Sequence, residues 1–186
     1  MATAYHETRL LPVREGYKKT DAAARKFVRW AWNKKIIKLP YHRPDSKTGH
    51  VYYGRGFIQL TWAENYKKMG RAIGMGDELY LNPDLVLMPE VAAKVLTVGM
   101  IKGKFRYKRS KEEKVGIVQK VKNVFKGKRS NSEYKYSGPQ KLKLYFNDVE
   151  NEWVKARNII NGDGKNYGAQ VAGYGKKFLG CLREQE

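Results

Sequence analysis

Two glutamates lie close together near the start of the chain, in the stretch AYHETRLLPVREGY (residues 4–17). Glu7 belongs to a segment long enough for one or two helical turns, and Glu15 comes eight residues later, beyond Pro12. Because proline ends or bends a helix, the two carboxyl groups stand on either side of a bend. A proton donor and a proton acceptor that flank one bond are what acid–base hydrolysis of a glycoside requires. On spacing alone, three other acids compete with Glu15 for the role of the second carboxyl group: Asp21, Asp45 and Glu64.

Both glutamates also have plainer interpretations. Glu7 follows Tyr5 and His6, and partial burial among such rings would suit its carboxyl group to donate a proton near neutral pH. The alternative for Glu7 is a solvated surface glutamate. For Glu15, which is expected in a loop, the alternative is a salt bridge to the neighbouring Arg14. We interpret His6 as a packing or capping residue.

The composition predicts a single domain with a strongly basic surface. The 186 residues carry 38 Lys and Arg against 18 Asp and Glu, a formal net charge of +20. Such a charge attracts polyanions, which include nucleic acid, anionic lipid and an acidic cell wall. The charge alone does not choose among them.

Cysteine usage and the N-terminal residues limit the remaining classes. The single cysteine, Cys181, excludes an intramolecular disulfide, and the three histidines show no zinc-type spacing, so we expect neither a metal nor another cofactor. The sequence MATAYHETR lacks the regions of a secretory signal, and no apolar run approaches the roughly 18 residues of a membrane span. We therefore expect synthesis in a cytoplasm.

The stretch VYYGRGFIQLTW (residues 51–62) combines aromatic residues, two glycines and polar side chains. Aromatic rings stack on sugar faces, while amide and hydroxyl groups bind sugar hydroxyls. This composition predicts a sugar-binding segment, and the alternative is a β-rich core segment with a surface glutamine. Its candidate residues are Tyr52, Tyr53, Gln59, Thr61 and Trp62.

The remaining patterns are mostly helical, so the predicted fold class is mainly α with a short β segment near 51–62. Between about 105 and 137 the chain becomes strongly basic, and a capping box of Ser110 and Glu113 indicates a helical or hairpin-like insertion. We expect one domain over residues 1–186 that carries this insertion. Helices are expected at 2–8, at 22–33 with Asp21 as N-cap, at 64–74, at 89–101, around 140–161 and from about 169.

Several stretches together resemble the family 19 glycoside hydrolases, the chitinases and phage endolysins of lysozyme-like fold. The matching stretches are AYHET (4–8), PVREGY (12–17), YYGRGFIQLTWAENY (52–66), NPDLVLMPEVAAKVLTVGM (82–100) and YFND…ARNIINGDG (145–164). No single motif is specific for the family, but the combination of HET, YYGRG-x-x-QLTW and IING in this order is specific. The resemblance implies a two-lobed, lysozyme-like α domain.

The resemblance also implies roles for individual residues. Glu7 occupies the glutamate of the HET motif and is implied as the general acid. Gln59, Thr61 and Asn65 are implied to bind sugar or position water, and Asn161 to contact the substrate. The endolysin-like branch carries a glutamate in its PVRE segment, which makes Glu15 the expected base. Because the family works with inversion, this base would activate a water molecule opposite the departing sugar.

Three departures from the family pattern stand out. Only Met1–Tyr5 precede the HET motif, whereas relatives usually have a further helical segment there. The connection at about 105–137 is longer and more basic than usual. Plant members carry an arginine near the last helix, where this chain has Gln170, so that contact is not carried over.

These observations predict a hydrolase of β-1,4 bonds between N-acetylated amino sugars. Peptidoglycan is favoured over chitin because the motifs lean to the endolysin-like branch and because a basic protein suits an anionic wall or outer membrane. We expect a monomer that reaches the wall by holin-type release. The alternatives are a chitinase acting on chitin oligomers, a non-catalytic cationic protein that binds walls or membranes, and, less favoured, nucleic-acid binding through the basic insertion.

Overall fold

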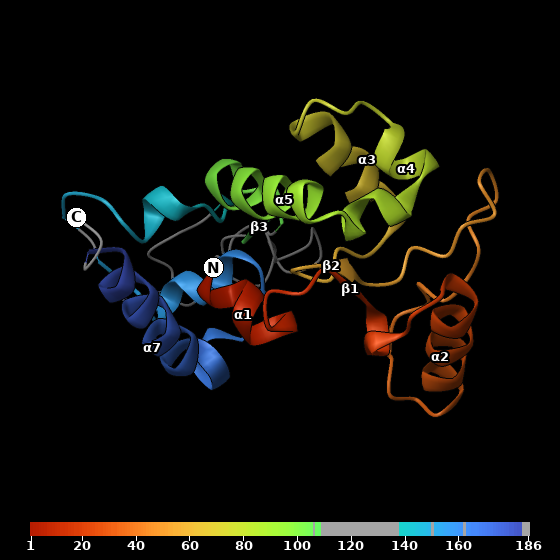
Figure 1. Ribbon diagram of the computed structural model, residues 1–186, viewed down its shortest axis with the longest axis horizontal. Helices are drawn as coiled ribbons and strands as arrows, with labels where there is room; N and C mark the ends of the chain where they lie inside the picture. The colour runs from red at the N-terminus through yellow and green to blue at the C-terminus, as the bar shows by residue number, and fades with distance from the viewer. Residues whose placement is uncertain (106, 109–137, 150, 162, 184–186) are drawn as a thin grey trace, which may run out of the picture.

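The protein is described by a computed structural model that places residues 1–105, 107–108, 138–149, 151–161 and 163–183 (Figure 1). The predicted basic insertion, with its capping box of Ser110 and Glu113, lies almost entirely outside these described residues. The single-domain organisation therefore stays a prediction. None of the helices among the described residues is long and apolar enough to cross a membrane.

Helices make up most of the described regular structure. The α-helices are α1 (Ala2–Thr8), α2 (Asp21–Asn33), α3 (Ala63–Ala72), α4 (Glu78–Leu81), α5 (Pro89–Lys102) and α7 (Gly164–Arg183). The 3₁₀ turns are η1 (Glu15–Tyr17), η2 (Pro83–Leu87), η4 (Leu142–Leu144) and η5 (Lys155–Ile159). The predicted mainly α fold is confirmed, and it is consistent with the lysozyme-like arrangement that the resemblance implies.

Two short antiparallel ladders supply the strands. β1 (Val13–Arg14) pairs with β2 (Arg55–Gly56), and β3 (Tyr107–Lys108) pairs with β4 (Gly138–Pro139). Figure 1 shows α2 at one end of the molecule and α7 at the other, with β1 and β2 between them. The first ladder therefore joins the two parts of the molecule.

Local chemistry explains where the clearest helices begin and end. The Thr20 hydroxyl accepts a hydrogen bond from Ala23 N at 3.2 Å, so the N-cap of α2 is Thr20 and the predicted cap Asp21 is the first helical residue. Pro89 occupies the first turn of α5, as expected, and Gly103 ends it with φ of 63°.

The apolar core forms two clusters. The larger one lies among α3, α4 and α5 and includes Ala4 from α1. The smaller one joins α2 to the segment before β2 and consists of Ala24, Val28, Val51 and Tyr53. The two clusters meet at the segment before β2, where Tyr52 belongs to the larger one and Val51 and Tyr53 to the smaller one. Polar contacts also converge near this segment.

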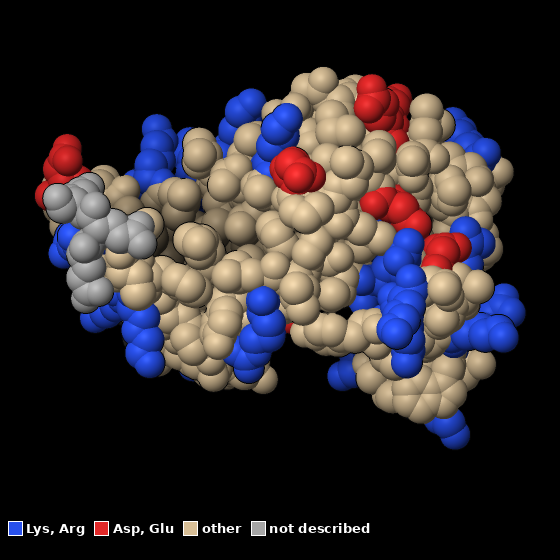
Figure 2. Space-filling view, viewed as in Figure 1, with Lys and Arg blue, Asp and Glu red and all other residues tan. Residues whose placement is uncertain are grey.

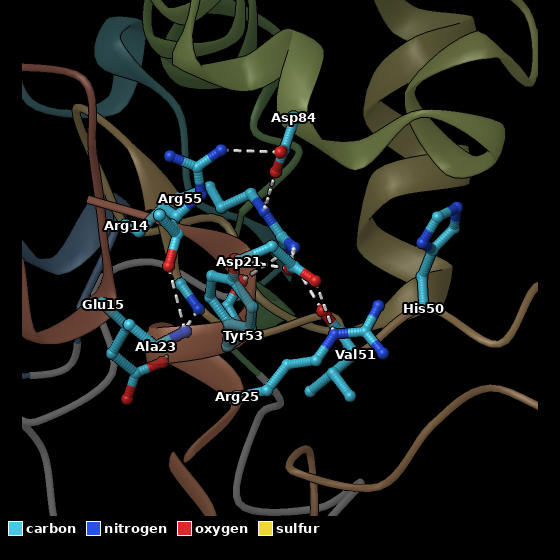
Figure 3. A network of polar contacts seen from close by, with 12 residues as sticks. Arg14, Glu15, Asp21, Ala23, Arg25, His50, Val51, Tyr53, Arg55 and Asp84 are labelled. Atoms are coloured by element: carbon cyan, nitrogen blue, oxygen red, sulfur yellow. Dashed lines mark hydrogen bonds and ion pairs between the residues drawn. The ribbon is translucent and has the colours of Figure 1, made fainter. Parts of the chain in front are cut away.

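A buried arginine provides these contacts (Figure 3). The Arg55 side chain is 1% exposed and donates hydrogen bonds to Asp84 Oδ1 at 2.8 Å and to Asp21 Oδ1 at 3.1 Å. Its guanidinium carbon lies 3.6 Å from the centre of the Tyr53 ring. Asp84 also pairs with Arg14 of β1 at 2.6 Å. This network ties α2, η2 and both strands of the central ladder to one point.

The C-terminal third departs from the expected helices. The predicted helix over 140–161 is wrong, because the Asn147 carboxamide accepts a hydrogen bond from Val149 N at 2.9 Å and turns the chain. Among the described residues of this stretch, the helical segments are the short η4 and η5. The last helix begins at Gly164, earlier than expected, because Asp163 O accepts bonds from the N–H groups of Asn166 and Tyr167.

We expect Gly56→Ala to destabilise the protein strongly. Gly56 has φ of 76°, and an added Cβ would lie 2.6 Å from Val86 Cγ1 and 2.8 Å from Val86 O. We predict a loss of about 3 kcal/mol in the free energy of unfolding, measured by urea denaturation. Gly49→Ala is the control, because Gly49 has φ of 70° but nothing within 4 Å of its Cβ position. It should cost only about 1 kcal/mol, and equal losses in both variants would refute the packing argument.

The ion pairs of Asp21 predict a response to acid. Burial by itself would raise the pKa of this carboxyl, but the hydrogen bond from Tyr53 and the charges of Arg25 and Arg55 outweigh it, so the pKa lies below its ordinary value of 3.8. The resulting stabilisation is complete above that ordinary value and is lost as the pH falls through the lowered pKa. The gap in unfolding free energy between wild type and Asp21→Asn should therefore shrink between about pH 6 and about pH 2.

Chemical denaturation at several pH values measures this gap. A gap for Asp21→Asn that stays constant down to about pH 2 would contradict the prediction.

Candidate active site

Glu7 lies on α1, which is held against α7 by aromatic contacts. The ring of Tyr5 lies 4.9 Å from that of Tyr174 and 5.8 Å from that of Phe178, both in edge-on geometry. His6 packs against Tyr167 at 5.1 Å, in line with the packing role expected for it. These contacts fix the orientation of the helix and leave Glu7 facing the segment before α7.

The Glu7 carboxyl group is hydrogen-bonded rather than solvated. Its Oε1 accepts bonds from Arg157 Nη2 and from Asn161 Nδ2, the latter at 2.9 Å. The side chain is 21% exposed, so the interpretation of Glu7 as a free surface glutamate is wrong. Within the described residues Oε2 has no hydrogen-bond partner, so this oxygen is open to a further contact.

Arg157 is the residue beside Glu7 that the sequence analysis missed. Its side chain is 1% exposed and also bonds Asp163, with Nε to Oδ1 at 2.9 Å. Burial would lower the pKa of the guanidinium, but the contacts with Asp163 and Glu7 outweigh this and raise it. Gln170, which stands where plant members carry an arginine, is exposed, and its amide donates a hydrogen bond to the Tyr174 hydroxyl. The position of Arg157, four residues before Asn161 in ARNIINGDG, was the available signal.

Glu15 follows β1 directly and is held by two donors. Its Oε1 accepts from the Tyr41 hydroxyl at 2.7 Å and its Oε2 from Gly54 N at 2.8 Å. Burial and the hydrogen bond to Glu15 raise the pKa of Tyr41, so its hydroxyl stays a donor at all ordinary pH values. Arg14 pairs with Asp84 instead, so the interpretation of Glu15 as the salt-bridge partner of Arg14 is wrong.

The three competing acids have other partners. Asp21 belongs to the network around Arg55, and Asp45 accepts bonds from the Tyr80 and Thr48 hydroxyls. Glu64 is 82% exposed and pairs with Lys67 at 3.0 Å. Of the acids considered, Glu7 bonds Asn161, which is implied to contact the substrate, whereas Asp21 bonds the buried Tyr53.

Those residues line one small polar cavity of about 120 Å³. It contains Gln59, Thr61, Asn65 and Asn161, all implied as substrate-binding by the resemblance. Residues from two distant parts of the sequence thus converge on one cavity. The volume suits a substituent of a sugar rather than a whole saccharide, because sites for whole small ligands are commonly 300 Å³ or more.

Some of the polar side chains in this cavity are already hydrogen-bonded to backbone carbonyl groups. The Gln59 amide nitrogen donates to Val13 O at 3.0 Å and to Gly56 O at 3.2 Å, so it joins β1 to the turn after β2. The Asn65 amide donates to Thr61 O at 2.8 Å. Gln59 therefore has a structural task, and only its carbonyl oxygen is left for a sugar.

The predicted role of Tyr53 in sugar binding is corrected by the structure. Tyr53 is 0% exposed, donates to Asp21 at 2.7 Å, and has the Arg55 guanidinium over its ring. A ring buried in this way has no face for a sugar. Trp62 is the accessible aromatic residue of this stretch, at 37% exposed, and its ring meets that of Tyr41 at 5.7 Å.

Each glutamate is held by residues of the candidate site. Asn161 bonds Glu7 and lines the polar cavity. Trp62, which follows the cavity residue Thr61, adjoins the ring of Tyr41, whose hydroxyl bonds Glu15. The site thus offers two carboxyl groups that are each fixed by hydrogen bonds. No group of three or more His, Cys, Asp or Glu residues suited to a metal occurs in the described part of the chain.

Comparison with known proteins supports the resemblance over part of the chain. A family model described as chitinase class I, of glycoside hydrolase family 19, matches residues 33–117. The resemblance to this family is thereby confirmed. The matched segment contains Gln59, Thr61 and Asn65 and runs into the predicted basic insertion, whereas Glu7, Glu15 and Asn161 lie outside it.

The individual relatives are plant proteins. The chain is 63% identical to an acidic 26 kDa endochitinase of Solanum lycopersicum over 35 residues. The aligned residues make up 19% of this chain and 14% of the relative. The chain is 55% identical over 61 residues to endochitinase 1 of Theobroma cacao, covering 31% and 18%. It is also 51% identical over 43 residues to inactive chitinase-like protein 1 of Hevea brasiliensis, covering 23% and 13%. Each match thus spans less than a fifth of the relative, and no solved structure matches the chain.

Replacing Arg157 should destabilise the fold as well as the site. Arg157→Met leaves the carboxyl groups of Glu7 and Asp163, 21% and 28% exposed, without their cation. We predict a loss of about 3 kcal/mol in unfolding free energy by urea denaturation. Arg71→Met removes a pair in which the arginine is 67% exposed, so it should cost less than about 1 kcal/mol. If both variants lose the same amount, the pairing of Arg157 is not structurally important.

Proposed function

We propose that this chain is a glycoside hydrolase that cleaves β-1,4 bonds between N-acetylated amino sugars with inversion. The observation that carries the proposal is the fixed Glu7 carboxyl group, which Asn161 links to the polar cavity. The family 19 match supports the reaction class. Because the curated relatives are matched over less than a fifth of their length, the activity rests on this geometry.

Glu7 would act as the general acid. Arg157 and Asn161 hold its Oε1, so Oε2 points the proton toward the glycosidic oxygen. As the bond breaks, the proton moves to the leaving sugar and positive charge develops at the anomeric carbon. The proton transfer leaves Glu7 as a carboxylate, which its bond to the Arg157 guanidinium stabilises.

Glu15 would act as the general base. Tyr41 and Gly54 N fix both of its oxygens, each of which keeps further lone-pair capacity for a water molecule. This water attacks the anomeric carbon from the face opposite the leaving group and gives its proton to Glu15. Trp62 offers an exposed ring on which a sugar can stack beside the attacking water.

For the polymer, peptidoglycan is our first choice and chitin the second. The net charge of +20 favours an anionic wall, while the printed names of the relatives, endochitinases, favour chitin. In this proposal basic residues bind an anionic wall or outer-membrane surface, the protein acts as a monomer, and it reaches the wall by holin-type release. Nucleic-acid binding is not part of it.

Glu7→Gln should abolish hydrolysis while leaving the fold intact. Glutamine keeps an oxygen that accepts from Asn161 but has no proton to donate, so we expect a loss of at least about 100-fold in turnover. Glu15→Gln should cause a similar loss because the water is no longer deprotonated. Release of reducing ends from peptidoglycan and from chitin oligomers measures both.

Glu64→Gln is the matched control, because it changes an exposed glutamate that pairs only with Lys67. It should retain wild-type turnover. Full activity of Glu7→Gln would refute the assignment of the acid. A wild-type protein that binds the polymers but releases no reducing ends would instead favour the non-catalytic alternative, to which the name of the Hevea brasiliensis relative also points.

A further inference from the structure

The helix α2 and the segment after it carry charge of one sign. Residues 22–44 contain seven Lys or Arg and no Asp or Glu. The flanking acids are both engaged: Asp21 pairs with Arg25 and Arg55, and Asp45 accepts bonds from Thr48 and Tyr80. In Figure 2 the end of the molecule formed by α2 carries several Lys and Arg side chains.

Exposed apolar side chains lie among these charges. Along α2 the buried residues are Ala24, Val28 and Ala31, whereas Lys26, Arg29 and Trp30 are exposed. Trp30 is 49% exposed, and after the helix Ile36 and Leu39 are 62% and 56% exposed. We call the set Lys26, Arg29, Trp30, Lys34, Ile36 and Leu39 the α2 surface.

A hollow lies beside the α2 surface. It has a volume of about 590 Å³ and is lined by Trp32, Ile37, Lys35 and Lys38, with Asn33. It combines apolar walls with two ammonium groups. The same mixture of apolar and cationic groups thus continues beyond the helix.

We propose that the α2 surface docks onto an anionic phospholipid bilayer. Lys and Arg are attracted to phosphate head groups, while tryptophan and aliphatic side chains insert at the level where head groups meet acyl chains. A soluble polyanion such as nucleic acid or teichoic acid would satisfy the charges but leave Trp30, Ile36 and Leu39 in water. The exposed apolar residues therefore favour a bilayer. This inference specifies the anionic partner of the proposed function and assigns it to α2 rather than to the basic insertion.

Vesicle sedimentation tests the docking. Wild-type protein is centrifuged with large unilamellar vesicles of phosphatidylglycerol and phosphatidylcholine, and with vesicles of phosphatidylcholine alone. We expect binding to the first and little to the second. The triple variant Trp30→Gln, Ile36→Gln, Leu39→Gln should bind at least about tenfold more weakly. A second variant, Lys26→Gln, Arg29→Gln, Lys34→Gln, should lose a similar amount and should lose most of its salt dependence.

Matched controls change the same residue types elsewhere on the surface. Leu81, Ile101 and Val149 are 62%, 60% and 89% exposed, and their triple replacement by Gln should leave binding within about twofold of wild type. Lys68, Lys94 and Lys176 are exposed and lie outside residues 22–44, so their replacement by Gln should have a smaller effect than the α2 charge variant. Circular dichroism and thermal melting check that every variant is folded.

Several results would overturn the inference. These are no sedimentation of wild type with phosphatidylglycerol, equal binding by the α2 variants and their controls, and binding to teichoic acid or DNA without binding to vesicles. Hydrolysis of soluble chitin oligomers by the same variants separates the inference from the proposed enzyme. If wild type shows no hydrolysis but its vesicle binding depends on the α2 surface, the hydrolase proposal fails and the docking inference stands.

Discussion

The fold depends on the burial of one cation between two carboxylates. Arg55 has almost no exposed surface, and it is neutralised by Asp21 of α2 and Asp84 of η2. A buried charge is costly without partners, so both aspartates must be in place before the guanidinium is stable. The network acts less as a source of net stability than as a requirement that α2, η2 and the central ladder adopt one relative position.

This requirement also positions the candidate site. The Arg55 backbone pairs with Arg14 in the central ladder, and Glu15 is the next residue along the chain. Glu15 N bonds Gly54 O, and Gly54 N bonds the Glu15 carboxylate, so the residues next to the buried cation fix the candidate base. The candidate acid is fixed independently, through α7 and Arg157. Two separate frameworks, joined by the ladder and the cavity residues, thus hold the two carboxyl groups.

The sequence was informative where a role depends on local pattern. The helix that bears Glu7 and the convergence of Asn161 with Gln59 followed from short motifs in a specific order. Tyr53 and Arg157 were not predictable in this way, because burial and ion pairing depend on residues far along the chain. An aromatic residue in a sugar-binding pattern looks the same whether its ring faces a cleft or an arginine. The helix expected over 140–161 failed because a single asparagine competes with the backbone hydrogen bonds of the helix.

The contacts of Glu7 also set when the site comes into existence during protein synthesis. Glu7 is separated by 150 residues from Arg157 and by 154 from Asn161. A chain that grows from its N-terminus therefore exposes the HET motif long before the groups that orient its carboxyl have been made. Contacts of such long sequence separation form late in folding, because the loop between them must first be closed. An incompletely translated chain thus carries the motif without the arrangement that would make it reactive.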